Sequence, residues 1–150
     1  TMCLTCSAYA FFAPFFPLHA ADFGLSHAEV GLIFGVFSLA QLLASPLVPP
    51  LAAVLSRRLV LIAGDVLLAF CTFAYGMVPH SDAAFWTFMV LRAGQGVGAV
   101  MASVCLYAAL SDAFPATRGQ VTGAAEVASS MGWACGPAAG GCLYAMGGFA

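Results

Sequence analysis

Charge is what this sequence has least of, and lysine is missing altogether. Charged residues make up 7% of the 150 residues, and the four basic ones are all arginines. Because soluble domains carry about 25% charged residues, so few charges cannot cover a surface that faces water. The mean hydropathy of +1.01 supports the same interpretation. The composition therefore predicts a protein embedded in the lipid bilayer, and the net charge of -2 argues against a nucleic-acid partner.

Catalytic and metal-binding patterns are missing as well. The sequence shows no nucleophile–base pair and no cluster of metal ligands, and His19, His27 and His80 lack metal-ligand spacing. We therefore expect no enzyme activity, no metal and no cofactor. The first apolar segment has no basic n-region and further apolar segments follow it, so we do not expect a signal peptide. Because the chain starts inside this segment at Thr1, we expect that its true N-terminus is missing.

All six cysteines lie in apolar stretches. Cysteine in such surroundings behaves as a small hydrophobic residue, so we expect free thiols that serve packing. Cys3 and Cys6 have the spacing of half a redox or metal motif, but this pair stands alone.

Apolar stretches long enough to cross the bilayer recur about five times, since roughly 20 helical residues span a hydrocarbon core of about 30 Å. Prolines interrupt the last third of the second stretch. Ser26 and Glu29 have the spacing of a capping box at its start. We predict an all-α, polytopic fold with helices over residues 2–20, 30–55, 59–78, 84–110 and 119–147.

The arginines of the connections predict the orientation. Arg57 and Arg58 lie between the second and third helices and Arg118 between the fourth and fifth, whereas the other two connections contain no Lys or Arg. By the positive-inside rule, the connections with arginines are cytoplasmic. The chain would then enter from the cytoplasm and end on the far side after an odd number of spans, which suggests a truncated chain.

Two charged residues, Arg92 and Glu126, lie well inside predicted spans, where ionisable groups are costly and usually functional. At a rise of about 1.5 Å per residue, Arg92 is about 12–15 Å from the outer end of its helix and Glu126 about 12 Å from the inner end. In a core of about 30 Å, the two would differ by roughly 3–6 Å in depth. We interpret them as an interacting pair that faces one polar cavity, where Glu126 gains and loses a proton. The alternative is a static ion pair that joins two helices.

Two other polar residues of the spans are candidates for lesser roles. Asp65 lies near the cytoplasmic end of the third helix, where we expect it to pair with Arg57 or Arg58. Gln41 in the second helix is a candidate for lining a cavity on the substrate pathway.

Small residues dominate the fifth stretch, from Gly123 to Gly141. Gly132, Gly136 and Gly140 are four apart, so on a helix they form one stripe of bare backbone against which a partner helix can pack. Pro137 removes a helical hydrogen bond beside this stripe and favours a bend. Such a helix is expected in lipid, pressed against a neighbour.

The fourth and fifth stretches resemble the N-terminal half of a major facilitator superfamily transporter. Residues 91–98 read LRAGQGVG, which is similar to the family's motif of an arginine followed by Gln-Gly and small residues. The resemblance implies that Arg92 takes part in proton coupling, and Gln95 is a candidate for the coupling or substrate pathway. The fifth stretch matches the family's antiporter motif, which implies close helix packing and bending during transport. The matching positions are Gly123, Gly132, Gly136, Pro137, Gly140 and Gly141.

The connection between the second and third helices departs from the loop motif of this family. Pro49, Ala53 and Ser56 stand where the resemblance would place a glycine, an aspartate and a second glycine, and only Arg57 and Arg58 remain basic. The cytoplasmic latch formed by this motif in the family is therefore in doubt here. Asp65 of the third helix is a candidate to replace the missing aspartate.

At a finer level, the chain resembles vesicular amine transporters, nearest their polyamine branch, in residues 15–17, 31–47 and 113–115 and in Glu126 with the GPAAGGCLY run that follows. The resemblance implies part of an N-terminal six-helix bundle whose partner, the C-terminal half, is missing. It also implies antiport of a small organic cation against protons, driven by a proton gradient, in a vesicular or plasma membrane. The alternatives are a multidrug efflux antiporter at the plasma membrane and an uncoupled facilitator or channel. The expected partners are the bilayer, the solute with its protons and the missing half.

Overall fold

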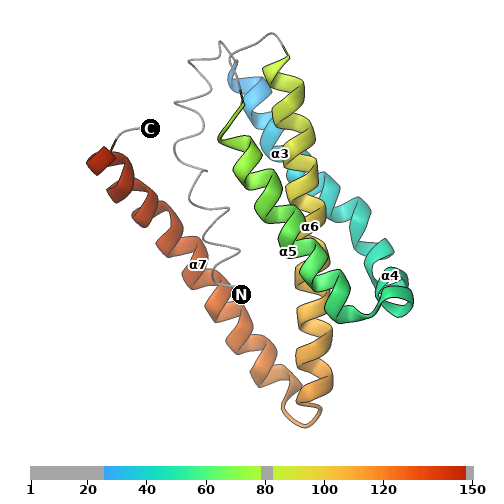
Figure 1. The fold of residues 1–150 in the computed structure, drawn as a ribbon. Helices are drawn as coiled ribbons and strands as arrows, with labels where there is room; N and C mark the ends of the chain where they lie inside the picture. The colour runs from blue at the N-terminus through green and yellow to red at the C-terminus, as the bar shows by residue number, and fades with distance from the viewer. Residues whose placement is uncertain (1–25, 79–82, 148–150) are drawn as a thin grey trace.

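The computed structural model describes residues 26–78 and 83–147, and for residues 139–141 and 143–147 it describes the backbone alone. Throughout this described part of the chain the regular elements are helices, which confirms the predicted all-α class (Figure 1). They are α3 (His27–Ala44), the short 3-10 helix η1 (Ser45–Leu47), α4 (Val48–Leu55), α5 (Arg57–Tyr75), α6 (Ala84–Ala113) and α7 (Arg118–Gly147). The first predicted helix, residues 2–20, lies outside the described residues.

Helix α3 begins where the sequence predicts a cap and ends where proline appears. The Ser26 hydroxyl accepts a hydrogen bond from the Glu29 amide (3.3 Å), and the Glu29 carboxylate accepts one from the Ser26 amide (2.7 Å). This confirms the capping box. Because proline lacks an N–H and blocks the helical ladder, the expected continuous helix over 30–55 is divided at η1, which contains Pro46.

Helix α6 lies between α3 and α5 and packs against both of them. A Cβ atom added to Gly64 of α5 would lie 2.7 Å from the Gly98 carbonyl oxygen of α6, so the two backbones are in contact there. A Cβ added to Gly96 would collide with the carbonyl oxygen of Phe37 on α3. Glycine at these positions therefore allows the three helices to approach closely, as small residues do between membrane helices.

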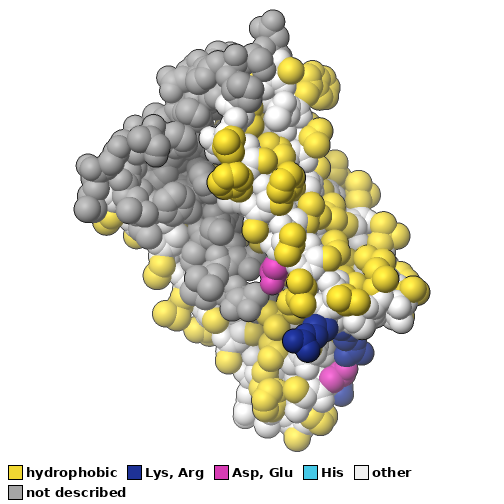
Figure 2. Space-filling model, in the orientation of Figure 1, with side chains coloured by type: hydrophobic (Ala, Val, Ile, Leu, Met, Phe, Trp, Pro, Cys, Tyr) yellow, Lys and Arg dark blue, Asp and Glu magenta, His cyan; other side chains and the backbone are white. Residues whose placement is uncertain are grey.

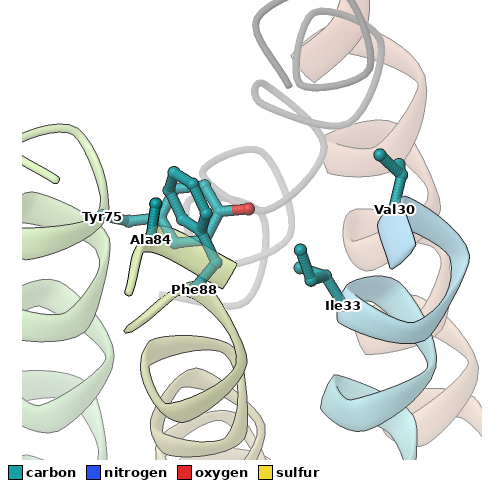
Figure 3. Close-up of a cluster of buried hydrophobic side chains, with 5 residues drawn as sticks. All are labelled: Val30, Ile33, Tyr75, Ala84 and Phe88. Carbon is teal, nitrogen blue, oxygen red and sulfur yellow. The ribbon is translucent and has the colours of Figure 1, made fainter. Parts of the chain in front are cut away.

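One hydrophobic cluster joins the N-terminal ends of α3 and α6 with the C-terminal end of α5 and consists of Val30, Ile33, Tyr75, Ala84 and Phe88 (Figure 3). The rings of Tyr75 and Phe88 are 4.8 Å apart between centroids, and the Tyr75 hydroxyl points from α5 toward α3. This cluster positions Tyr75 beside the segment of α6 that carries the buried polar residues.

The surface of the helices is apolar, whereas the buried residues include polar ones. Side chains such as Leu42, Val54 and Phe73 are exposed, while Arg92 is 2% exposed, and Figure 2 shows hydrophobic side chains over most of the visible described face. Three segments are long and apolar enough to cross a membrane: His27–Leu55, Arg57–Tyr75 and Ala84–Ala113. Helix α7 has 30 residues, as α6 does, and is richer in Gly, Ala and Ser. The number of five spans stays a prediction.

Candidate functional site

Arg92 is a charged residue in the interior of the described helices. It lies on α6, and its guanidinium carbon is 4.9 Å from the centroid of the Phe34 ring on α3 and 4.8 Å from that of Tyr75 on α5. Aromatic faces attract cations at such distances. The aromatic residues of both neighbouring helices thus hold the guanidinium, which makes Arg92 a contact point of all three helices.

A chain of hydrogen bonds runs from Arg92 to the backbone of α5. Arg92 Nη1 donates to Gln95 Oε1 (3.0 Å), and Gln95 Nε2 donates to Thr72 Oγ1 (3.2 Å). The Thr72 hydroxyl in turn donates to the Leu68 carbonyl oxygen (2.7 Å). This chain of hydrogen bonds connects α6 with α5. Gln95, which is 4% exposed, lies between Arg92 and Thr72, a link that the sequence did not predict.

Glu126 lies at a different level and has a different partner. The Tyr107 hydroxyl of α6 donates to Glu126 Oε1 of α7 (2.5 Å). Tyr107 is fifteen residues beyond Arg92 on the same helix, a distance of about 22 Å along the axis. The side chains of Arg92 and Glu126 cannot bridge this distance, even when both are extended. The interpretation of Arg92 and Glu126 as an interacting pair, and the static ion pair as its alternative, are therefore wrong for this structure.

The error arises from helix length. The depths of the two residues were counted from opposite ends of a core of about 30 Å, but α6 has 30 residues and is about 45 Å long. Counts from its two ends therefore do not meet at one level. Helix α7 also diverges from α6 after their connection (Figure 1), and the Tyr107–Glu126 contact lies near that connection.

Near the end of the bundle that carries the connections with arginines, Arg57 forms an ion pair with Asp112. Figure 2 shows basic side chains beside an acidic one in this region. The expected pairing of Asp65 with Arg57 or Arg58 is wrong, since neither arginine forms an ion pair with Asp65 in the described part of the chain. Asp65 is eight residues from Arg57 on the same helix, beyond the three or four residues at which helical side chains meet, whereas Asp112 is in the last turn of the adjacent α6. Arg118 Nε donates to the Ser111 carbonyl oxygen (3.0 Å), which caps the same end of α6.

The residues of the loop and antiporter motifs have contrasting environments. Ser56, between α4 and α5, has a φ of 76°, a conformation that favours the glycine which the resemblance places there. In α7, Gly132 and Gly136 are buried and Pro137 lies inside the helix, whereas a Cβ added to Gly123 would meet nothing within 4 Å. Gly140 and Gly141 lie in the part of α7 described by its backbone alone.

Three other expectations concern single residues. Gln41 lies partly exposed on α3, and the hydrogen-bond chain from Arg92 does not include its side chain. Among the cysteines that the structure describes, Cys71 and Cys105 are buried and Cys135 and Cys142 are exposed, all as free thiols. Cys3 and Cys6 lie outside the described residues. No group of metal-binding side chains occurs within residues 26–78 and 83–147.

A buried arginine in an apolar helical bundle, together with the two motifs, is typical of one transporter family, and comparison with known proteins agrees. The sequence model of the Major Facilitator Superfamily matches residues 1–150. The chain belongs to the major facilitator superfamily. This is a family of integral, multi-pass membrane transporters, which are not enzymes.

Individual relatives in the major facilitator superfamily support this assignment. The MFS-type transporter SLC18B1 of Rattus norvegicus is 30% identical over 139 residues, which cover 91% of this chain and 30% of that protein. The uncharacterized MFS-type transporter MJ1560 of Methanocaldococcus jannaschii is 27% identical over 137 residues, 91% of this chain and 34% of that protein. Quinolone resistance protein NorA of Staphylococcus aureus is 27% identical over 129 residues, 85% of this chain and 32% of that protein. The chain thus spans about a third of the length of these curated relatives.

Sequence reasoning missed the residues that surround Arg92 and Glu126. Phe34, Tyr75 and Thr72 contact the Arg92 network, and Tyr107 binds Glu126. A hydroxyl group in an apolar helix, as in Thr72 and Tyr107, was a signal that could have identified two of them. Phe34 carried no such signal, because the sequence contains 13 phenylalanines.

Proposed function

We propose that the chain is the N-terminal part of a proton-coupled antiporter that exchanges protons for a small organic cation by alternating access. The proton gradient would drive transport, with no other cofactor. The observation that carries this proposal is the burial of Arg92 among apolar helices with a partner from each neighbouring helix. A buried intramembrane charge is expensive and usually serves function, and the superfamily resemblance implies a role of this arginine in proton coupling.

Glu126 is the candidate proton acceptor of this antiporter. Its carboxylate is exposed on α7 and accepts the hydrogen bond from Tyr107. An ionised carboxylate only accepts hydrogen bonds, whereas a protonated one also donates. Gain of a proton would therefore change the contact between α6 and α7 near the point where these helices diverge, and such a change links protonation to helix movement.

The antiporter-motif residues would permit that movement. Gly132 and Gly136 are buried on α7, where the absence of side chains allows close approach of another helix. Pro137, which lacks the N–H of one helical hydrogen bond, lowers the cost of bending beside them. In this proposal Gly123 contributes in another conformation, since a side chain there has space in this one.

The solute class is inferred from the relatives. Similarity to the vesicular amine transporters supports an amine or polyamine, carried across a vesicular membrane. Similarity to a quinolone resistance protein supports the second candidate, a multidrug efflux antiporter at the plasma membrane. Both candidates require the C-terminal half of the transporter as a partner, and both differ from an uncoupled facilitator or channel in their dependence on a proton gradient.

Uptake into proteoliposomes with an acidic lumen tests the proposal. The full-length protein is screened with spermidine, serotonin and ethidium, and we expect accumulation that nigericin abolishes by collapsing the pH gradient. Uptake that is unchanged after collapse of the gradient would contradict antiport and favour a facilitator.

Three variants test the assignment of Glu126. Glu126→Gln should abolish gradient-driven accumulation, and Tyr107→Phe should reduce it less, because it removes only the hydrogen-bond donor. Glu29→Gln is the matched control, since glutamine retains the capping box. Full coupling in Glu126→Gln would overturn the assignment of this residue while leaving the family unaffected.

A further inference from the structure

The hydrogen-bond chain from Arg92 to α5 has a single direction. Each residue donates to the next: Arg92 Nη1 to Gln95 Oε1 within α6, Gln95 Nε2 to Thr72 Oγ1 from α6 to α5, and the Thr72 hydroxyl to the Leu68 carbonyl oxygen within α5. A threonine hydroxyl has one proton. Because the Thr72 hydroxyl donates this proton to the Leu68 carbonyl oxygen, which lies 2.7 Å from the Thr72 oxygen, the Thr72 oxygen faces Gln95 as an acceptor.

This direction fixes the amide of Gln95. The amide has a donating and an accepting end, whereas a guanidinium only donates. With its Nε2 turned to Thr72, Gln95 presents Oε1 to Arg92, and both contacts are well formed. In the reversed orientation, the NH2 group of Gln95 would face the guanidinium, so that two donors meet. The Thr72 hydroxyl would then have to donate to Gln95 and give up its hydrogen bond to the Leu68 carbonyl oxygen.

Thr72 also lies one helical turn before Tyr75, whose ring is 4.8 Å from the Arg92 guanidinium carbon. Helix α5 is therefore linked to the Arg92 side chain directly, through the Tyr75 ring, and indirectly, through the hydrogen bond from Gln95 to Thr72. Residues three apart lie on the same face of a helix, so a shift of α5 along α6 would change both contacts together.

We propose that Thr72 is a positioning residue for proton coupling, which holds the Gln95 amide in the orientation that places the Arg92 guanidinium between the rings of Phe34 and Tyr75. Thr72 acts through Gln95 and does not contact the solute or the proton. This inference rests on the proposed function, proton-coupled antiport, and adds to it the element that links the position of Arg92 to α5.

The test compares three substitutions in the full-length protein in proteoliposomes. Thr72→Val keeps the shape and removes the hydroxyl, and Thr72→Ser restores a hydroxyl. Thr87→Val is the matched control, because the Thr87 hydroxyl also donates to the carbonyl oxygen four residues earlier, that of Ala83 (3.0 Å), but lies outside the chain of hydrogen bonds. The probe is radiolabelled spermidine, measured as uptake driven by a pH gradient and as counterflow at equal pH.

Thr72→Val should lower gradient-driven uptake about tenfold. The reason is that a buried amide which loses its acceptor costs on the order of 1.4 kcal/mol, and this free energy corresponds to a tenfold change. Counterflow requires no net proton movement and should change less than twofold. Thr72→Ser should recover most of the uptake, and Thr87→Val should resemble the wild type. This separation of uptake from counterflow would not arise from simple loss of helix packing.

Equal losses of uptake and counterflow in Thr72→Val would overturn the inference in favour of a packing role, and so would wild-type uptake in this variant. A double-mutant cycle with Gln95→Leu in thermal unfolding provides a readout without transport, in which additive effects of the two substitutions would also overturn it. If the wild type takes up none of spermidine, serotonin and ethidium against a pH gradient, the proposed function itself is overturned, and this inference with it.

Discussion

Ser56 offers a test of the backbone that connects α4 to α5. Its φ of 76° and ψ of 142° lie in a region that residues with a side chain rarely adopt and glycine adopts readily. Its side chain forms no capping hydrogen bond to α5. Replacement by glycine should therefore relieve strain without loss of a contact at the start of that helix.

The magnitude follows from two opposing terms. Backbone strain of this type costs about 1–3 kcal/mol, while glycine loses about 0.5–1 kcal/mol through the greater entropy of the unfolded chain. Because the first term is larger, Ser56→Gly should stabilise the protein by about 0.5–2 kcal/mol. Ser56→Ala should be nearly neutral, since alanine retains the strain and the hydroxyl has no capping role.

The assay is thermal unfolding of the full-length protein in detergent, followed by tryptophan fluorescence. Ser45→Gly is the matched control, because Ser45 has helical angles, φ -50° and ψ -47°, at which glycine destabilises. The same substitution should thus raise the unfolding midpoint at one serine and lower it at the other. A fall in the midpoint of Ser56→Gly similar to that of Ser45→Gly would refute the strain argument.

Three further predictions concern helix contacts and accessibility. Gly98→Ala should destabilise the protein by about 1–3 kcal/mol, because the new Cβ would lie 2.7 Å from the Gly64 carbonyl oxygen and 2.9 Å from the Leu68 amide nitrogen. Gly35→Ala is the control, because a Cβ there meets nothing within 4 Å. Equal unfolding midpoints of the two variants would contradict this prediction. Asp112→Asn should change the midpoint only slightly, because exposed ion pairs contribute little, and in double-mutant cycles Arg57 should couple to Asp112 and not to Asp65. In single-cysteine variants, exposed Cys135 should react with a maleimide much faster than buried Cys105, and similar rates would show that the burial is misassigned.

The features that sequence predicted well depend on local chemistry. The apolar runs around α5 and α6 have the length and composition of membrane helices, and the Ser26–Glu29 cap depends on residues three apart. Pro46 interrupts a helix by its own covalent structure. The position of Arg92 inside a span followed from its place within such a run.

The contacts that sequence did not predict depend on how whole helices are placed. The level of Glu126 relative to Arg92 depends on the length of α6 beyond the hydrocarbon core and on the divergence of α7. The ion pair of Arg57 joins residues 55 positions apart, and a pairing at this separation has no periodic signal in the sequence. Thr72 and Tyr107 acquire their partners in the same way, through the packing of α5 and α7 against α6.

The most direct test of proton-coupled antiport is the lumenal pH of proteoliposomes that contain the full-length protein and a trapped pH-sensitive dye. Ethidium is the added solute, because its permanent charge carries no proton across the membrane. With the lumen and the outside at equal pH, ethidium entry should drive protons out and make the lumen more alkaline, and Glu126→Gln should abolish this change. Ethidium entry at the wild-type rate with no change in lumenal pH would contradict the account.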